Sequence, residues 1–105
     1  MNPIHITIQS EDFDLSAEVA ALRKHDGRVG AVCSFVGTVR DRNGPEHGVA
    51  AMELEHYPGM TERELAAIEA EARQRWPLDD VLIIHRHGRM LPGDDIVLVI
   101  CCSAH

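Results

Sequence analysis

Two arginines that follow an apolar run are the residues whose types and spacing point most directly to chemistry. Arg40 and Arg42 come after the run at residues 32–39, in which Gly37 leaves room for a ligand or a second stretch of backbone. A guanidinium is a rigid fork of donors that suits a phosphate or a carboxylate. These residues predict an anion site at the end of a strand. The alternative is that both arginines are solvated and partly neutralised by Asp41.

Histidines, a tyrosine and cysteines form a second group of candidates. His56 and Tyr57 lie at a proline-glycine turn and could shape a pocket, or could bridge core and surface through satisfied hydrogen bonds. Four further side chains offer donors for zinc or copper, namely His85, His87, Cys101 and Cys102. Their spacing fits no standard zinc finger or ribbon, and the two adjacent cysteines point to opposite faces of a strand. We therefore expect no metal site and no cofactor.

Length, composition and charge limit the class of protein. The chain has 105 residues, 45% of them hydrophobic and 26% charged, so we expect a single domain at residues 1–105. No apolar run approaches the roughly 20 residues that span a bilayer, and no signal peptide is evident, so we expect a cytoplasmic protein without a membrane partner. A net charge of -7 argues against nucleic acid as a partner. All three cysteines lie in apolar runs and are expected to be buried, reduced thiols.

The elements that must position these residues follow from hydrophobic periodicity. The predicted strands span residues 4–8, 30–39, 49–56, 81–85 and 96–102. A first helix is expected to start at Asp14 or Ser16, to end near Lys24 and to turn Val19 and Leu22 inward. The second predicted strand is apolar enough to be buried on both faces or nearly so. This order of strands and helices favours an α+β fold with a mainly antiparallel sheet.

A second helix is predicted to begin with a capping box, in which Thr61 pairs with Glu64, and to end at Pro77. Its apolar stripe is expected to face the core and consists of Leu65, Ile68, Ala72 and Trp76. Two ion pairs are expected on its wetter side, Glu69 with Arg73 and Glu71 with Arg75. Between the strands, the polar loop at residues 42–48 is expected to be mobile, and the Pro-Gly-Asp sequence at residues 92–94 is expected to turn the chain.

Five motifs, taken in order along the chain, resemble the large, catalytic subunit of molybdopterin synthase, the MoaE family. They are FVGTVR at residues 35–40, LEHYPGM at 54–60, RWPL at 75–78, IHR through LPGD at 84–94, and SAH at 103–105. Each motif alone is weak, but five in register are specific. The resemblance implies an α/β-hammerhead type of fold with two helices.

The resemblance also implies an activity and its partners. Members of this family transfer sulfur from the C-terminal thiocarboxylate of a small ubiquitin-like subunit, of the MoaD type, to cyclic pyranopterin monophosphate, and so form molybdopterin. The large subunits form a homodimer at the centre of a heterotetramer. Thr38, Val39 and Arg40 match the strand exit that contacts substrate in the family, and His105 matches a pocket histidine. Arg40 and His105 are thus the expected catalytic residues, with Arg40 holding an anion and His105 moving protons.

The chain departs from the family pattern in one respect. Family members continue for roughly a third of their length beyond the position of His105, through a segment that includes the lysines thought to act on the intermediate. The only lysine of this chain is Lys24, which lies in the first predicted helix. No residue here matches those lysines, so we expect a truncated member of the family. The alternative function is a catalytically impaired module that keeps the binding and dimerisation surfaces.

Overall fold

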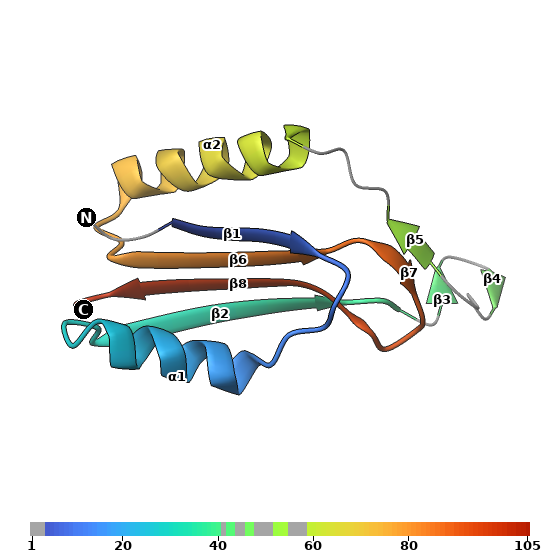
Figure 1. Cartoon of the computed structure of the whole chain (residues 1–105), viewed down its shortest axis with the longest axis horizontal. Coiled ribbons are helices and arrows are strands. Elements are labelled where there is room, and N and C mark those ends of the chain that lie inside the picture. The colour runs from blue at the N-terminus through green and yellow to red at the C-terminus, as the bar shows by residue number, and fades with distance from the viewer. Residues whose placement is uncertain (1–3, 41, 44–45, 48–51, 55–58) are drawn as a thin grey trace.

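The computed structural model describes residues 4–40, 42–43, 46–47, 52–54 and 59–105, which form an α+β fold with one helix on each side of a central sheet (Figure 1). The sheet has the strand order β1-β6-β8-β2. Its strands are β1 (Ile4–Gln9), β6 (Asp80–Arg86), β8 (Asp95–Ser103) and β2 (Ala31–Thr38). Strands β1 and β6 run parallel, and the other two pairings are antiparallel. The predicted fold class and these four predicted strands are therefore confirmed.

Four short strands lie beyond one end of this sheet. They are β3 (Arg42–Asn43), β4 (Glu46–His47), β5 (Met52–Leu54) and β7 (Gly88–Met90). Strand β3 pairs with β4, and β5 pairs with β7, which the sequence did not predict. Of the predicted strand at residues 49–56, only β5 lies within the described residues. Part of the loop expected to be mobile forms β3 and β4, and the rest of it lies outside the described residues, as does Tyr57.

The first helix, α1 (Leu15–His25), has the predicted limits. The Asp14 carboxylate caps it by accepting a hydrogen bond from the Ala17 backbone N–H at 3.1 Å. Asp26 ends it, with its backbone N–H bonded to the Leu22 carbonyl at 3.2 Å. Because Leu22 is only 6% exposed, this residue anchors the helix to the sheet, as predicted.

The hydrophobic core lies between α1 and one face of the sheet. Leu22 packs there against side chains from the two central strands, Leu82, Ile84, Leu98, Ile100 and Cys102. Full burial of one such aliphatic side chain stabilises the fold by about 1.5–3 kcal/mol. Val81 and Ile83 alternate with these positions along β6 and are buried on the opposite face, which α2 covers.

The second helix, α2 (Met60–Arg75), begins earlier than predicted. Its cap is Gly59, whose φ of 83° lies in the left-handed region that favours glycine. The Glu62 carboxylate accepts a hydrogen bond from the Gly59 N–H at 3.0 Å, so the predicted pairing of Thr61 with Glu64 is wrong by two residues. The end of the helix is as predicted, because Trp76 is the last residue bonded to it before Pro77.

The face that α2 turns toward the sheet also differs from the prediction. Glu69 is 3% exposed, whereas Ile68 is 62% and Trp76 57% exposed. Glu69 pairs with Arg73, and the Arg73 guanidinium also donates to the Leu78 carbonyl at 2.9 Å. An ion pair can be buried when its charges neutralise each other and its polar atoms are hydrogen-bonded. The helix therefore turns the face with Glu69 toward the sheet, instead of the apolar stripe that the sequence predicted. The predicted surface pair Glu71–Arg75 is confirmed, at 2.8 Å.

Strand β2 is less buried than its composition predicted. It forms an edge of the sheet, and Phe35 on it is 61% exposed. A buried apolar strand needs a neighbour on each side and cover on both faces, and an edge strand lacks one neighbour. The same position explains why Cys33 is exposed, contrary to prediction, whereas Cys101 is partly buried and Cys102 is fully buried.

Candidate functional site

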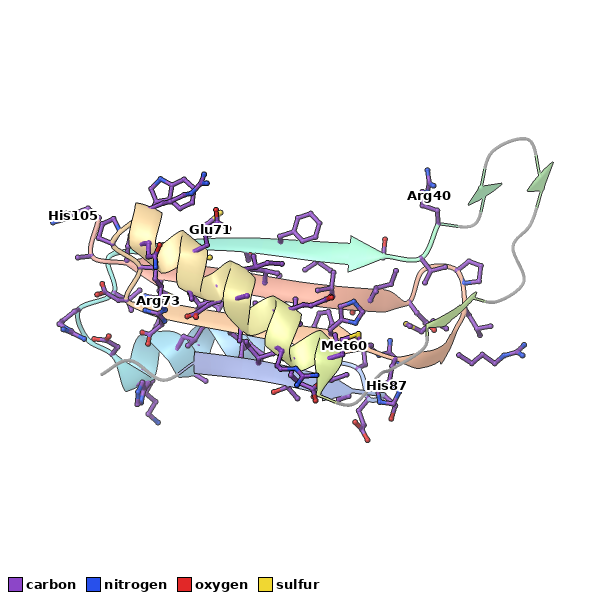
Figure 2. The ribbon with its side chains drawn as sticks, turned by 90° about the horizontal axis from the view of Figure 1, so that it is seen from above. Arg40, Met60, Glu71, Arg73, His87 and His105 are labelled. Carbon is purple, nitrogen blue, oxygen red and sulfur yellow. The ribbon has the colours of Figure 1, made fainter. Side chains whose placement is uncertain are left out.

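Arg40 lies just beyond the end of β2, and the backbone of the preceding residue, Val39, is fixed by two hydrogen bonds. Val39 is 5% exposed, its N–H donates to the Asp94 carbonyl at 2.9 Å, and its carbonyl accepts from the Gly93 N–H at 2.9 Å. Thr38 and Arg40, on either side of it, are exposed. Figure 2 shows the Arg40 side chain projecting outward from the end of the strand. Thr38 and Arg40 can therefore meet a ligand, while the Val39 side chain and its backbone groups are already occupied.

Gly37 marks an irregularity just before this corner. The register of β2 against β8 shifts between Gly37 and Thr38. A Cβ atom at Gly37 would lie 2.9 Å from Cγ1 of Val97, which is closer than such atoms pack. Of the two alternatives that the sequence left open at Gly37, a ligand or a second stretch of the chain, the approach of the neighbouring strand accounts for the glycine.

A second arginine, Arg86, forms hydrogen bonds to the ends of neighbouring strands at the same end of the sheet as Arg40. Arg86 donates to the Asp95 carbonyl at 2.8 Å and to the Ser10 carbonyl at 3.0 Å and 3.1 Å. Burial, followed by the nearby Asp12 carboxyl group, raises the pKa of Asp95. Arg86 thus fixes the ends of β1, β6 and β8, and Arg40 projects from a rigid frame.

His105 lies at the opposite end of the sheet. The Ser103 hydroxyl donates to the His105 carbonyl at 2.6 Å, and Gly30 donates from its backbone to the Ser103 carbonyl at 2.9 Å. A cavity of about 150 Å³ opens beside the histidine and is lined by Pro77, Asp79, Ser103, Ala104 and His105. This volume accommodates a small polar group rather than a whole pterin.

The structure does not bring Arg40 and His105 together within one chain. Strand β2 pairs with β8 in an antiparallel manner from Ala31 to Thr38, so the exit of β2 and the exit of β8 lie at opposite ends (Figure 2). With a rise of roughly 3.3 Å per residue, the paired stretch alone separates them by about 25 Å. A single small substrate cannot contact both residues of the same chain.

An acidic cluster that the sequence analysis did not single out lies at the His105 end. Asp80 is fully buried, and neither of its carboxylate oxygens has a hydrogen-bonding partner within the described part of the chain. Burial, followed by the charge of Asp26, raises the pKa of Asp80. Hydrogen bonds from Arg28, 3.1 Å away, lower the pKa of Asp26 to about 2. The signal in the sequence was a carboxylate directly before the apolar run at residues 81–84 of β6.

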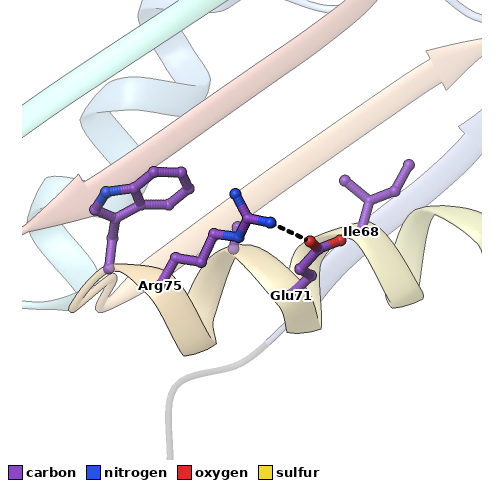
Figure 3. Close-up of a pocket in the computed structure, with 5 residues that line it drawn as sticks. Ile68, Glu71 and Arg75 are labelled. Atoms are coloured by element: carbon purple, nitrogen blue, oxygen red, sulfur yellow. Dashed lines mark hydrogen bonds and ion pairs between the residues drawn. The ribbon is translucent and has the colours of Figure 1, made fainter.

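The remaining candidates contribute less to a site. His56, Tyr57 and Asp41 lie outside the described residues, and His85 Nδ1 lies 2.9 Å from the Arg86 carbonyl. Among the residues that the structure describes, no group of three or more potential ligands could hold a metal ion. A shallow hollow of about 220 Å³ follows α2 and includes the Glu71–Arg75 pair (Figure 3). It contains none of the predicted site residues.

Comparison with known proteins identifies the family. The model of the MoaE protein family matches residues 8–105, so the chain belongs to the MoaE family and the resemblance seen in its motifs is confirmed. It is 53% identical over 100 residues to the molybdopterin synthase catalytic subunit of Mesorhizobium japonicum, and 58% identical over 100 residues to that of Ralstonia nicotianae. Each alignment covers 95% of this chain, but only 61% and 56% of the respective relative. The chain therefore spans less than two thirds of the length of these relatives.

Solved structures agree with this assignment. The MoaE protein of Burkholderia ambifaria has a TM-score of 0.86 and 57% identity, over 98% of this chain and 66% of that one. A complex of subunits 1 and 2 of the molybdopterin-converting factor of Helicobacter pylori contains a chain with a TM-score of 0.73 and 18% identity, over 95% of this chain and 66% of that one. At that identity the similarity shows the fold alone. In the described residues of our chain, no helix is long and apolar enough to cross a membrane.

Proposed function

We propose that this chain forms the core of a molybdopterin synthase catalytic subunit and acts in molybdenum cofactor biosynthesis. The reaction is the transfer of sulfur from the thiocarboxylate of a small ubiquitin-like subunit to cyclic pyranopterin monophosphate. The match to the MoaE family over residues 8–105 carries this proposal. The substrates are both anionic, whereas the chain has a net charge of -7, so their binding requires a local cation.

Arg40 is the residue that we assign to this role. It is exposed, while the preceding Val39 is locked by two backbone hydrogen bonds, so the position of its Cα is fixed before substrate arrives. A guanidinium can bind a phosphate or a thiocarboxylate through two parallel hydrogen bonds. Thr38, also exposed, offers a hydroxyl group on the same edge.

His105 is the second proposed catalytic residue, and it serves a partner chain. Because Arg40 and His105 lie at opposite ends of the sheet, an active site that uses both must combine Arg40 of one chain with His105 of another. A two-fold dimer would create two such sites, since each chain supplies one residue to each. This geometry supports the homodimer that the family resemblance implied.

A second candidate function is a binding and dimerisation module with little turnover of its own. The observation that favours it is the position of Lys24, the sole lysine, in the last turn of α1. That turn lies at the opposite end of the molecule from the exit of β2 (Figure 1). Lys24 therefore cannot act on an intermediate held by Arg40 of the same chain, and in the shared site proposed above only Lys24 of the chain that supplies His105 lies at the same end.

Reconstitution distinguishes the two functions. The purified chain is mixed with thiocarboxylated small subunit and cyclic pyranopterin monophosphate, and molybdopterin formation is measured beside complex formation by size exclusion. Turnover supports the synthase, a complex without turnover supports the binding module, and the absence of both contradicts both. In an active preparation, Arg40→Ala is expected to lower kcat/KM on the order of 30-fold or more, because it removes a charged partner of the substrate. Arg23→Ala, which changes an exposed arginine on α1, is the control and should leave kcat/KM unchanged.

A further inference from the structure

Two cysteines from distant parts of the sequence oppose each other across the strand pair β2–β8. Cys33 and Cys101 are register partners in this antiparallel pairing. Directly opposed residues point to the same face, with Cα atoms about 4.5 or 5.5 Å apart according to the hydrogen-bonding pattern. Both values lie within the usual range for a disulfide, about 4.4–6.8 Å. The backbone thus already satisfies the main requirement for a link between these two residues.

The two thiols differ in access. Cys33 is exposed because β2 forms the sheet edge, whereas Cys101 is partly buried. Burial, followed by the charge of the Cys33 thiolate, raises the pKa of Cys101, which is consistent with sulfur atoms close enough to interact. Cys101 alternates along β8 with Ile100 and Cys102, which lie in the core beneath α1, so the Cys101 side chain points to the face that α2 covers. Cys102 points to the other face, where it is buried in the core beneath α1.

We propose that Cys33 and Cys101 form a dithiol modification site, which a small-molecule disulfide such as oxidised glutathione converts reversibly into an intrachain disulfide. The Cys33 thiolate attacks one sulfur of the reagent, forms a mixed disulfide and releases one reduced thiol. The Cys101 thiolate then attacks the Cys33 sulfur and releases the second reduced thiol. Two protein thiols are oxidised, one external disulfide is reduced to two thiols, and the two protons pass to the leaving thiolates.

The geometry makes this link reversible rather than structural. The Cβ atoms of directly opposed residues lie about 4.5–5.5 Å apart, whereas a disulfide brings them to about 3.8 Å, so the strands must approach each other. Strained or exposed disulfides have more oxidising potentials and are reduced readily by thiols. The link would join the edge strand that leads to Arg40 to the strand that ends near His105.

The test exposes the native protein to oxidised glutathione and follows intact mass. The wild-type chain is expected to lose the mass of two hydrogens without retaining glutathione, and to regain it with excess reduced glutathione. Cys101→Ser is expected to stop at a glutathione adduct, and Cys33→Ser to form neither product at a comparable rate. Cys102→Ser, the matched control, should form the same disulfide as the wild type. Circular dichroism of each variant verifies that it is folded.

A second probe avoids any oxidation of the protein. Phenylarsine oxide condenses with two close thiols and releases water, and its binding is measured on the folded chain by intact mass. One equivalent is expected on the wild type and on Cys102→Ser, and none that survives dilution on Cys33→Ser or Cys101→Ser. The proposal is overturned if the wild type retains glutathione as a stable adduct, or if loss of Cys102 rather than Cys101 prevents closure.

Discussion

Removal of the Glu69 carboxylate should be among the most damaging single changes on α2. Glu69 is 3% exposed and pairs with Arg73, whose side chain is 23% exposed. Loss of one partner of a buried ion pair costs about 3–5 kcal/mol because the other charge stays buried. In Glu69→Ala the Arg73 guanidinium would keep its 2.9 Å hydrogen bond to the Leu78 carbonyl. We therefore expect a loss of unfolding free energy at the lower end of this range, about 3 kcal/mol. Small domains have only about 5–15 kcal/mol of stability in total, so this loss is easily measured.

The same helix provides a matched control for this prediction. Glu71 and Arg75 have the same spacing and a 2.8 Å contact, but their side chains are 61% and 62% exposed. Glu71→Ala should therefore cost only about 0.3–0.5 kcal/mol. Urea unfolding followed by circular dichroism compares the two variants, and the combined change Glu69→Leu with Arg73→Met should lose less than Glu69→Ala alone. Equal losses for Glu69→Ala and Glu71→Ala would refute the assignment of a buried pair.

Two further predictions concern backbone contact and pH. A Cβ atom at Gly30 would lie 2.1 Å from the Ala104 carbonyl oxygen, so Gly30→Ala should destabilise the fold by about 1–3 kcal/mol. Gly27→Ala meets nothing within 4 Å and should have little effect in the same urea titration; equal effects would contradict the contact. Burial raises the pKa of Asp80 above its ordinary value of 3.8, so its contribution to stability is fully present below that pH and is lost as the pH rises through the raised value. Asp80→Asn should flatten this fall in unfolding free energy with pH, and an unchanged slope would exclude Asp80 as its source.

Local sequence signals predicted where helices and strands begin and end more reliably than they predicted which side chains are buried. Asp14 caps the start of α1 and Asp26 ends it, and both depend on backbone groups a few residues away, so both could be predicted from the local sequence. The exposure of Phe35 depends on which strands pair, and the sequence of β2 does not state that it forms an edge. Burial of Glu69 likewise depends on a partner one turn away and on the carbonyl group of Leu78.

The candidate site likewise combines features that the local sequence predicted with features that depend on distant segments. The position of Arg40 at a strand exit followed from the apolar run that precedes it, and Thr38 is exposed beside it. The burial of Val39 depends on hydrogen bonds to Gly93 and Asp94, which lie more than fifty positions away. The distance between Arg40 and His105 follows from the antiparallel pairing of β2 with β8, which no motif encodes.

Complementation between two inactive variants tests the proposed shared active site most directly. Arg40→Ala and His105→Ala chains are mixed, allowed to exchange subunits and assayed for molybdopterin formation with the small subunit and pterin precursor. If each site combines Arg40 of one chain with His105 of the other, every mixed dimer has one intact site, and random mixing restores about a quarter of the wild-type activity. Activity in the mixture that stays at the level of the separate variants would contradict a site shared between two chains.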